Sequence, residues 1–282
     1  MLLYLALTRW ARASDGQPIR IGLTPVILDN RIGFLRNWAR WLGRELQHPV
    51  EFTQRAKYQD IMDLLERGQL DAAWICGYPY VRNMDTLELL AVPVYRGKPL
   101  YRSYIIAHVH NKEIMKLSDM RGKVFAFSDP LSNSGYLYPV YRLHQLFPNE
   151  HQPQRKLFRR TFFTWGHRHV IEAVADGLAD AGAVDGYIWD QLSRLHPRLT
   201  SQTRIIEKSP EFGFPPLVTT KRLSAERYNA LALAFGRMHE DPQGRELLHA
   251  LGLDRFAFRT PKLFAGIALM ASIVGDELGQ EK

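Results

Sequence analysis

Short apolar stretches alternate with amphipathic stretches along the first third of the chain. Apolar runs at Ile19 to Leu23 and Leu70 to Cys76 have the length of strands, and Glu51 to Gln54 suggests another strand between them. Between them, Ile32 to Leu46 and Tyr58 to Arg67 carry apolar residues at helical spacing. This order predicts a parallel sheet flanked by helices.

A second series of the same kind begins at Tyr101. Its predicted strands are Tyr101 to Val109, Lys123 to Phe127, Phe162 to Thr164 and Ala179 to Val184, with helices from about Ser134 to Leu146 and from His167 to Asp176. The stretch from Ile205 to Thr220 contains three prolines and is therefore extended. Two more helices are predicted at about Ala225 to His239 and Gln243 to Leu251.

The extended stretch brings the chain back to its first half, so we expect two lobes joined by two crossings. We predict an α/β clamshell in which each lobe is a mixed, mostly parallel sheet flanked by helices. One lobe comprises residues 17–98 and 215–282, and the other comprises 99–214. The hinges lie near 98–102 and 207–216, and residues 1–16 form a leader.

Charge and cysteine content exclude some classes of function but do not identify one. A net charge of +8 suits anionic partners, but lysine and arginine are scattered, and the densest run, Arg155 to Arg160, is interpreted as a solvated loop entering a strand. We therefore predict no nucleic-acid binding. The single cysteine, Cys76, excludes an intrachain disulfide. The longest apolar stretch, Phe264 to Val274, is too short to span a membrane.

The N-terminus has some features of a secretion signal. Met1 to Leu7 is apolar, and Ala11-Arg12-Ala13 fits an A-x-A cleavage site. We interpret it as the end of a signal peptide whose start lies upstream, which predicts a periplasmic protein. The alternative is an ordinary mobile N-terminal segment.

The segment from Ser128 to Pro139 has the composition of an anion-binding helix start. A strand ends there, and Ser132, Asn133 and Ser134 precede the predicted helix, so side chains and first-turn amides can converge on one anion. Gly135 lets the backbone come close. The alternative is an N-cap that serves only its own helix.

Other residue types suggest weaker hypotheses. Cys76 ends a predicted strand, where clefts of α/β sheets form, so its thiol could contact a ligand, but we favour a buried inert thiol. The pairs His108/His110 and His167/His169 have the spacing of metal ligands on a strand, yet we predict no metal and no cofactor. No nucleophile and base pair, P-loop lysine or G-x-S-x-G motif is present, so we predict that the protein is not an enzyme.

Several motifs resemble, in order, those of phosphonate and phosphite binding proteins. They are RIGLTP from Arg20, the stretch from Tyr58 to Val81, YRSYIIAH from Tyr101, FAFSDPLSNSGYLYP from Phe125, the stretch from Gly166 to Asp185, and FPPLV from Phe214. This PhnD-like family belongs to the type II periplasmic solute-binding proteins of ABC transporters. The resemblance covers about 200 residues and implies the two-lobed fold.

The resemblance also implies a ligand site between the lobes. The matching positions are Tyr58, Tyr101, Ser132, Asn133, Ser134 and His167, with Asp185 as the candidate for holding a ligand amine, and with Cys76, Tyr78 and Tyr104 as possible additional contacts. Two positions depart from the family pattern. Asn133 replaces a usual Ser or Thr, and Arg168 replaces a common Asp and is expected to add positive charge near the cleft.

The resemblance therefore implies a monomeric protein that captures a small oxyanion and delivers it to an ABC permease. The alternative is a periplasmic sensor, for example of an arsenite-like ligand, that signals to a sensor histidine kinase. A titrating His167 would make binding depend on pH.

Overall fold

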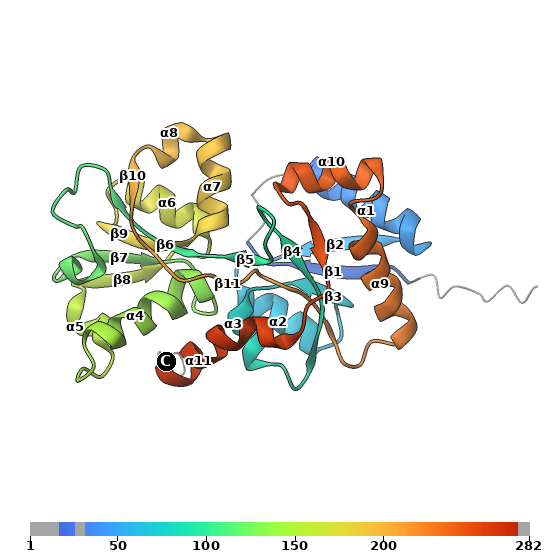
Figure 1. Ribbon diagram of the computed structural model, residues 1–282, viewed down its shortest axis with the longest axis horizontal. Helices are drawn as coiled ribbons and strands as arrows, with labels where there is room; N and C mark the ends of the chain where they lie inside the picture. The colour runs from blue at the N-terminus through green and yellow to red at the C-terminus, as the bar shows by residue number, and fades with distance from the viewer. Residues whose placement is uncertain (1–16, 26–31, 276–282) are drawn as a thin grey trace, which may run out of the picture.

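The computed structural model describes residues 17–25 and 32–275. The predicted leader at 1–16, with its cleavage motif, lies outside these ranges. The chain forms two α/β lobes side by side, joined by two strands that cross between them (Figure 1). Within the described residues no helix combines the length and apolarity needed to cross a membrane.

The first lobe is built on a six-stranded sheet. Its strand order is β13-β4-β12-β3-β1-β2. Its strands are β1 (Ile19–Leu23), β2 (Val50–Gln54), β3 (Ala72–Trp74), β4 (Leu87–Val94), β12 (Leu217–Thr220) and β13 (Arg255–Ala257). Its helices are α1 (Ile32–Leu46), α2 (Tyr58–Glu66), α3 (Gly77–Arg82), α9 (Ala225–Arg237), α10 (Pro242–Leu251), the 3₁₀ turn η3 (Pro261–Phe264) and α11 (Ala265–Val274).

The second lobe is built on a five-stranded sheet. Its strand order is β10-β6-β9-β7-β8. Its strands are β6 (Ser103–His108), β7 (Val124–Phe127), β8 (Arg160–Phe163), β9 (Ala181–Asp185) and β10 (Thr203–Lys208). Its helices are the 3₁₀ turn η1 (Leu117–Met120), the π turn η2 (Asn133–Leu137), α4 (Tyr138–Leu146), α5 (Pro153–Leu157), α6 (His167–Ala175), α7 (Gly186–Leu195) and α8 (Pro197–Thr200).

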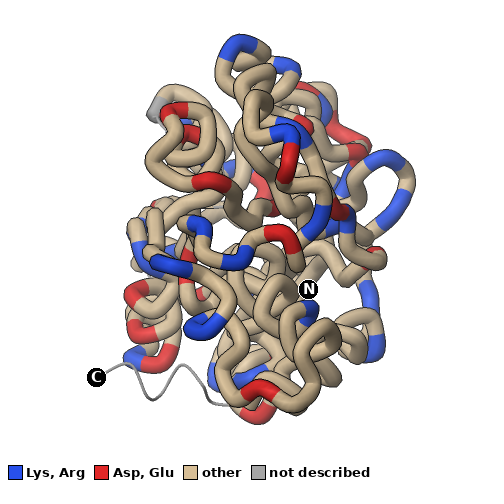
Figure 2. Tube along the Cα trace, turned by 90° about the vertical axis from the view of Figure 1, so that its left-hand side faces the viewer, with Lys and Arg blue, Asp and Glu red and all other residues tan. Residues whose placement is uncertain are grey.

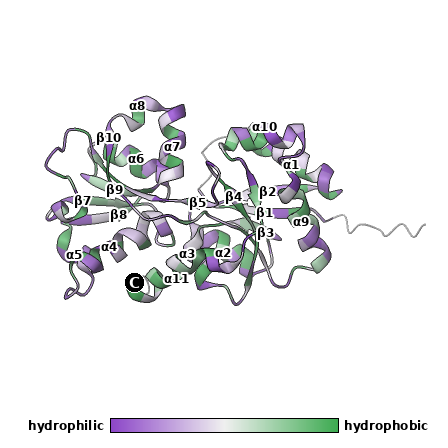
Figure 3. Cartoon of the chain, viewed as in Figure 1, coloured by the Kyte–Doolittle hydropathy of each residue, from purple (hydrophilic) through white to green (hydrophobic). Residues whose placement is uncertain are grey.

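Aromatic rings fill the core between the first sheet and its helices. Trp38 of α1 is fully buried and packs edge-on against Trp74 of β3 and Phe235 of α9. Hydrophobic and hydrophilic residues alternate along α1, α7 and α9 (Figure 3), as expected of helices with one face on a sheet.

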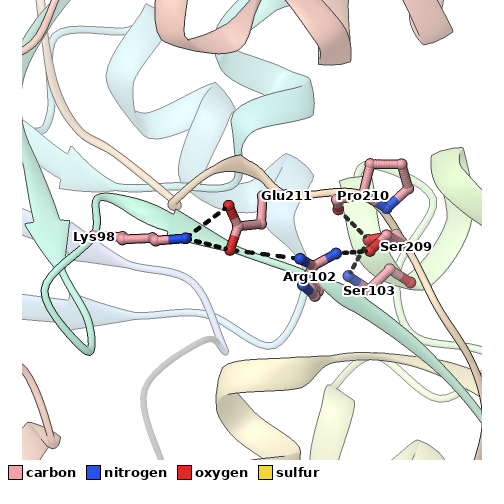
Figure 4. Close-up of polar contacts among 6 residues, drawn as sticks. All are labelled: Lys98, Arg102, Ser103, Ser209, Pro210 and Glu211. Carbon is pink, nitrogen blue, oxygen red and sulfur yellow. Dashed lines mark hydrogen bonds and ion pairs between the residues drawn. The ribbon is translucent and has the colours of Figure 1, made fainter.

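Two short antiparallel strands, β5 (Leu100–Tyr101) and β11 (Phe212–Gly213), join the lobes. Beside them, Glu211 accepts from Lys98 at 3.2 Å and forms an ion pair with Arg102 at 3.5 Å (Figure 4). Ser209 Oγ accepts from the Ser103 amide at 2.8 Å and donates to the Pro210 carbonyl. The two crossings are therefore tied to each other where the chain passes between lobes.

The C-terminal helix α11 contacts both lobes. It packs on α3 of the first lobe and on α4 and η2 of the second, and it lies beneath the junction in Figure 1. Phe264, just before α11, stacks edge-on against Tyr80 of α3 with ring centroids 5.0 Å apart.

The sequence predicted the strand and helix order well, and the structure confirms that both sheets are mixed. Among the described strands of the first lobe, β1 pairs in parallel with β2 and β3, whereas β12 and β13 make antiparallel pairs. In the second lobe β7 pairs in parallel with β8 and β9, whereas β6 and β10 are antiparallel. Strands β6 and β12 enter their sheets from the crossings and run opposite to their neighbours, so both sheets are mixed, as predicted.

Local predictions also needed correction. The basic run at Arg155 to Arg160 is partly helical, because Pro153 opens the short helix α5 before β8 begins. The helix expected from Ser134 begins one residue earlier with a π turn, in which the Ser132 carbonyl accepts from the amides of both Tyr136 and Leu137. The strand Leu87–Val94, which contains Pro93, was not predicted.

Lysine and arginine are interspersed with aspartate and glutamate over both lobes (Figure 2). In this view they do not gather in one basic stripe. The surface therefore offers no support for nucleic-acid binding.

Candidate functional site

A buried polar cluster lies where the two lobes meet. We call it the cleft cluster; it consists of Tyr58, Cys76, Tyr101, Ser128, Asp129, Ser132, Asn133, Ser134, His167 and Asp185, and each of these residues is at most 4% exposed. Most of its members follow the carboxyl ends of strands: Cys76 after β3, Ser128 after β7, and Asp185 at the end of β9. In α/β sheets, crevices form at such strand ends.

Tyr58 and His167 meet across the lobes. The Tyr58 hydroxyl lies 3.3 Å from His167 Nε2, and the Asp185 amide donates to His167 Nδ1 at 3.1 Å. Since Nδ1 accepts this bond, the neutral ring carries its proton on Nε2. Burial lowers the pKa of His167 to about 3, so the ring is a neutral donor and not the cation that the sequence left open.

Tyr101, Asn133 and Cys76 form a second contact between lobes. The Asn133 side-chain amide donates to the Tyr101 hydroxyl at 2.9 Å, and its backbone amide donates to Cys76 Sγ at 3.2 Å. Burial raises the pKa of the Cys76 thiol to about 11 and the pKa values of Tyr58 and Tyr101 well above 10. These side chains are therefore neutral at physiological pH.

The start of η2 presents hydroxyls that the protein leaves unused. Ser132 Oγ caps the turn by accepting from the Gly135 amide at 2.9 Å. The side-chain oxygens Ser128 Oγ, Ser134 Oγ and Asn133 Oδ1 are buried without a hydrogen-bond partner among the described residues. A buried unpaired polar group costs about 1 to 3 kcal/mol. The two hydroxyls can donate to the oxygens of a ligand, whereas Asn133 Oδ1 can only accept a hydrogen bond from a ligand O–H or N–H group.

Two carboxyl groups are the ionisable acids of the cleft cluster. Asp185 caps α7 by accepting from the amides of Tyr187 and Ile188, and burial raises its pKa to about 7. Asp129 accepts from the amides of Leu131 and Tyr58, and burial raises its pKa to about 6. The expected positive charge of Arg168 is paired with Glu172 at 2.8 Å on the same helix.

The structure brings together most of the residues that the sequence singled out. Tyr58, Tyr101, Ser132, Asn133, Ser134, His167, Asp185 and Cys76 all belong to the cleft cluster. Tyr78 is buried on α3, with the Arg82 guanidinium over its ring. Tyr104 packs against Trp189 and, together with Tyr101 of the cleft cluster, lines a separate pocket of about 230 Å³ beside the crossings.

Sequence reasoning missed Ser128 and Asp129 as site residues. The signal that could have identified them is their place directly after an apolar strand, ahead of the serine-rich turn. The histidine pairs do not form a metal site: the described residues contain no group of three or more His, Cys, Asp or Glu side chains that could hold a metal ion.

A buried set of hydrogen-bond donors between two hinged α/β lobes defines a class of protein. It is the class of two-lobed solute-binding proteins, which close around a ligand. A family model described as the periplasmic substrate-binding protein of phosphonate ABC transporters matches residues 22–262. The chain belongs to this family.

Two similar proteins have names that agree with this family assignment. The phosphate-import protein PhnD of Mycolicibacterium smegmatis is 27% identical over 60% of this chain, and the match spans 56% of that protein, a little over half of its length. A probable phosphite binding protein of an ABC transporter from Prochlorococcus marinus is 23% identical over 71% of this chain and 68% of its own.

Solved structures share the fold. A binding protein component of an ABC phosphonate transporter from Pseudomonas aeruginosa has a TM-score of 0.83 at 24% identity, covering 92% of this chain and 87% of its own. PhnD1 from Prochlorococcus marinus, in complex with methylphosphonate, has a TM-score of 0.79 at 19% identity, covering 92% and 99%. The fold is that of type II periplasmic binding proteins.

Proposed function

We propose that the protein captures a small phosphonate, phosphite or phosphate-like anion in the cleft cluster and delivers it to an ABC permease. The observation that carries this proposal is the set of neutral donors buried between the lobes. Tyr58, Tyr101, Ser134 and His167 each offer an O–H or N–H group there. A tetrahedral oxyanion can accept several such bonds at once, and bonds to an ionised group are stronger than neutral ones.

The lobe boundaries support a hinged mode of binding. We propose lobes at 17–98 with 215–282 and at 99–214, with hinge crossings near 98–102 and 207–216. Strands β5 and β11 lie within these crossings. Bending there opens and closes the cleft, and a ligand favours closure only through its extra affinity for the closed form.

The family's role supports a periplasmic location and an ABC permease as partner. We propose that residues 1–16 hold the end of a signal peptide and that the protein works as a monomer. The relatives named above are transport proteins and not enzymes, and they give no support to the alternative of signalling to a histidine kinase.

A thermal-shift screen tests the proposal. The ligands are phosphate, phosphite, methylphosphonate and aminoethylphosphonate, with sulfate as a comparison anion. A ligand at 100 times its Kd stabilises the fold by about 2.7 kcal/mol. We expect at least one phosphorus oxyanion to raise the Tm; a Tm unchanged by all of them contradicts the proposal.

Ser134→Ala is the sharpest variant for the same screen. Ser134 Oγ has no partner among the described residues, so its removal should leave folding intact and abolish most of the ligand-induced shift. Ser132→Ala is a less specific test, because Ser132 also caps its own turn and its loss would affect folding as well as binding. The matched control is Ser201→Ala on the exposed surface. An unchanged shift in Ser134→Ala rules out the assigned site.

A further inference from the structure

Asp129 is bonded to both lobes. It lies in the turn after β7 of the second lobe, where its Oδ1 accepts from the Leu131 amide at 2.8 Å. Its Oδ2 accepts from the Tyr58 amide of the first lobe at 3.1 Å. The residue is 2% exposed, so the interlobe bond is shielded from water.

The bond caps a helix that its own lobe leaves uncapped. Tyr58 is the first residue of α2, and the side chain of Lys57, at the N-cap position, makes no capping bond. The Lys57 ammonium instead lies 4.7 Å from the ring centroid of Trp165, in the second lobe. A carboxylate at a helix N-terminus is favourable both as a hydrogen-bond acceptor and through the helix dipole.

Tyr58, a proposed ligand contact, is held both at its backbone and at its hydroxyl group. Asp129 holds the backbone of Tyr58, while the Tyr58 hydroxyl meets His167. The Asp129 carbonyl also accepts from the Ser132 amide at 2.9 Å, at the start of the serine-rich turn. Closing the lobes therefore caps α2 and aligns Tyr58 with the opposite wall in one step.

We propose that Asp129 is a positioning residue that stabilises the closed form through this interlobe helix cap and so slows ligand release. The identity of the ligand in this proposal rests on the proposed function. The closure of the lobes through the Asp129 bond does not depend on it. Other charged groups that act on Asp129 are Asp60 and Lys57, both from the first turn of α2 or next to it.

Asp129→Asn tests the proposal. The amide oxygen can keep the local bond to Leu131, while the NH₂ group then faces the Tyr58 amide and cannot accept from it. Loss of a helix cap predicts about tenfold faster release of methylphosphonate, measured by stopped-flow fluorescence. The association rate should stay within about twofold of wild type, because the cap forms after the first encounter.

The control is Asp60→Asn. It removes one carboxylate charge from the first turn of α2 and leaves the interlobe bond of Asp129 intact. Its rate of methylphosphonate release should match that of wild type. Equal release rates in Asp129→Asn and wild type overturn the proposal, as does a slower association with unchanged release. If Asp129→Asn does not fold, Asp129→Ser replaces it, since serine can serve the local turn but is too short for Tyr58.

A second measurement separates this inference from the proposed function. If wild type binds none of the phosphorus oxyanions, the proposed function fails. The radius of gyration of the free proteins by small-angle X-ray scattering then decides the inference. A larger radius in Asp129→Asn supports it, and equal radii contradict it.

Discussion

Gly135 shows how tightly the serine-rich turn is built. A Cβ atom at this position would lie 1.9 Å from Ser128 Oγ and 3.1 Å from Ser132 Oγ. Glycine is therefore needed here for close approach and not for an unusual backbone angle. Both of these hydroxyls belong to the cleft cluster, so a side chain at 135 disturbs folding and binding together.

Gly135→Ala should lower the free energy of unfolding by about 1 to 3 kcal/mol, the usual cost of overpacking. It should also abolish the ligand-induced thermal shift. Gly33→Ala is the control, since a Cβ atom there meets nothing within 4 Å on helix α1, and it should be neutral or slightly stabilising. Equal denaturation midpoints for the two variants would show that the turn tolerates a side chain.

Asp185 makes stability depend on pH in a defined direction. Its pKa is raised from 3.8 to about 7, so the folded state holds the proton more tightly than the unfolded state. The stability that this provides is complete below pH 3.8 and is lost as the pH rises through 7. Asp129, with its pKa raised to about 6, acts in the same direction over a lower range.

Asp185→Asn should flatten this dependence between about pH 4 and 7, the range between the unfolded and folded pKa values of Asp185, because asparagine can still cap α7 but does not ionise. Urea denaturation at several pH values measures it: wild type should lose stability more steeply than the variant as the pH rises. Parallel curves for the two proteins would refute the assignment.

Local sequence identified many site residues but not their partners. The order of small polar residues after Phe127 pointed to Ser132, Asn133 and Ser134 without any structure. The neutral state of His167 depends on its burial, and its tautomer depends on the bond from the Asp185 amide, 18 residues away. The bond from Tyr58 to Asp129 spans 71 residues. Such pairings follow from closure of the lobes and have no local signature.

At the scale of elements, caps locate helix starts, and one cap also ties two helices together. Asp241 Oδ1 accepts from the Gly244 amide of α10 at 2.8 Å and from Trp41 Nε1 of α1 at 2.6 Å. Ser224 caps α9 with one weaker bond, from the Arg227 amide at 3.3 Å. The first of these caps therefore serves packing as well as helix formation.

Asp241→Ala should cost about 2 kcal/mol of stability, since it removes a cap and leaves the buried Trp41 ring without its partner. Ser224→Ala should cost about 1 kcal/mol. Neither change should alter ligand affinity, because both caps lie away from the cleft cluster. Chemical denaturation measures the two losses, and a smaller loss for Asp241→Ala than for Ser224→Ala would be inconsistent with a shared cap.

Element types were easier to predict from the sequence than their pairing. Periodicity located α1, α6, α9 and α10 closely, because each has one buried face. It predicted mixed sheets but not which strands run antiparallel, because β6 and β12 owe their orientation to the crossings between lobes. It also missed the π turn at Asn133–Leu137, since an additional residue in a turn leaves the apolar pattern almost unchanged.

At the scale of the whole molecule, the two lobes contribute complementary parts of one site. The first lobe supplies Tyr58 and Cys76, and the second supplies Ser134, His167 and Asp185. Tyr101 lies on the crossing between them. The ion pairs of Glu211 beside the crossings are exposed and contribute little to stability, so they oppose the proposed bending of the crossings only weakly.

We propose that a phosphorus oxyanion binds between the lobes in the cleft cluster. A crystal structure grown with saturating methylphosphonate would show this site directly. We expect the anion between the lobes, within hydrogen-bond distance of Ser134 Oγ and the Tyr58 hydroxyl. Methylphosphonate bound elsewhere on the protein, with the cleft cluster making no contact to it, would rule out the proposed site.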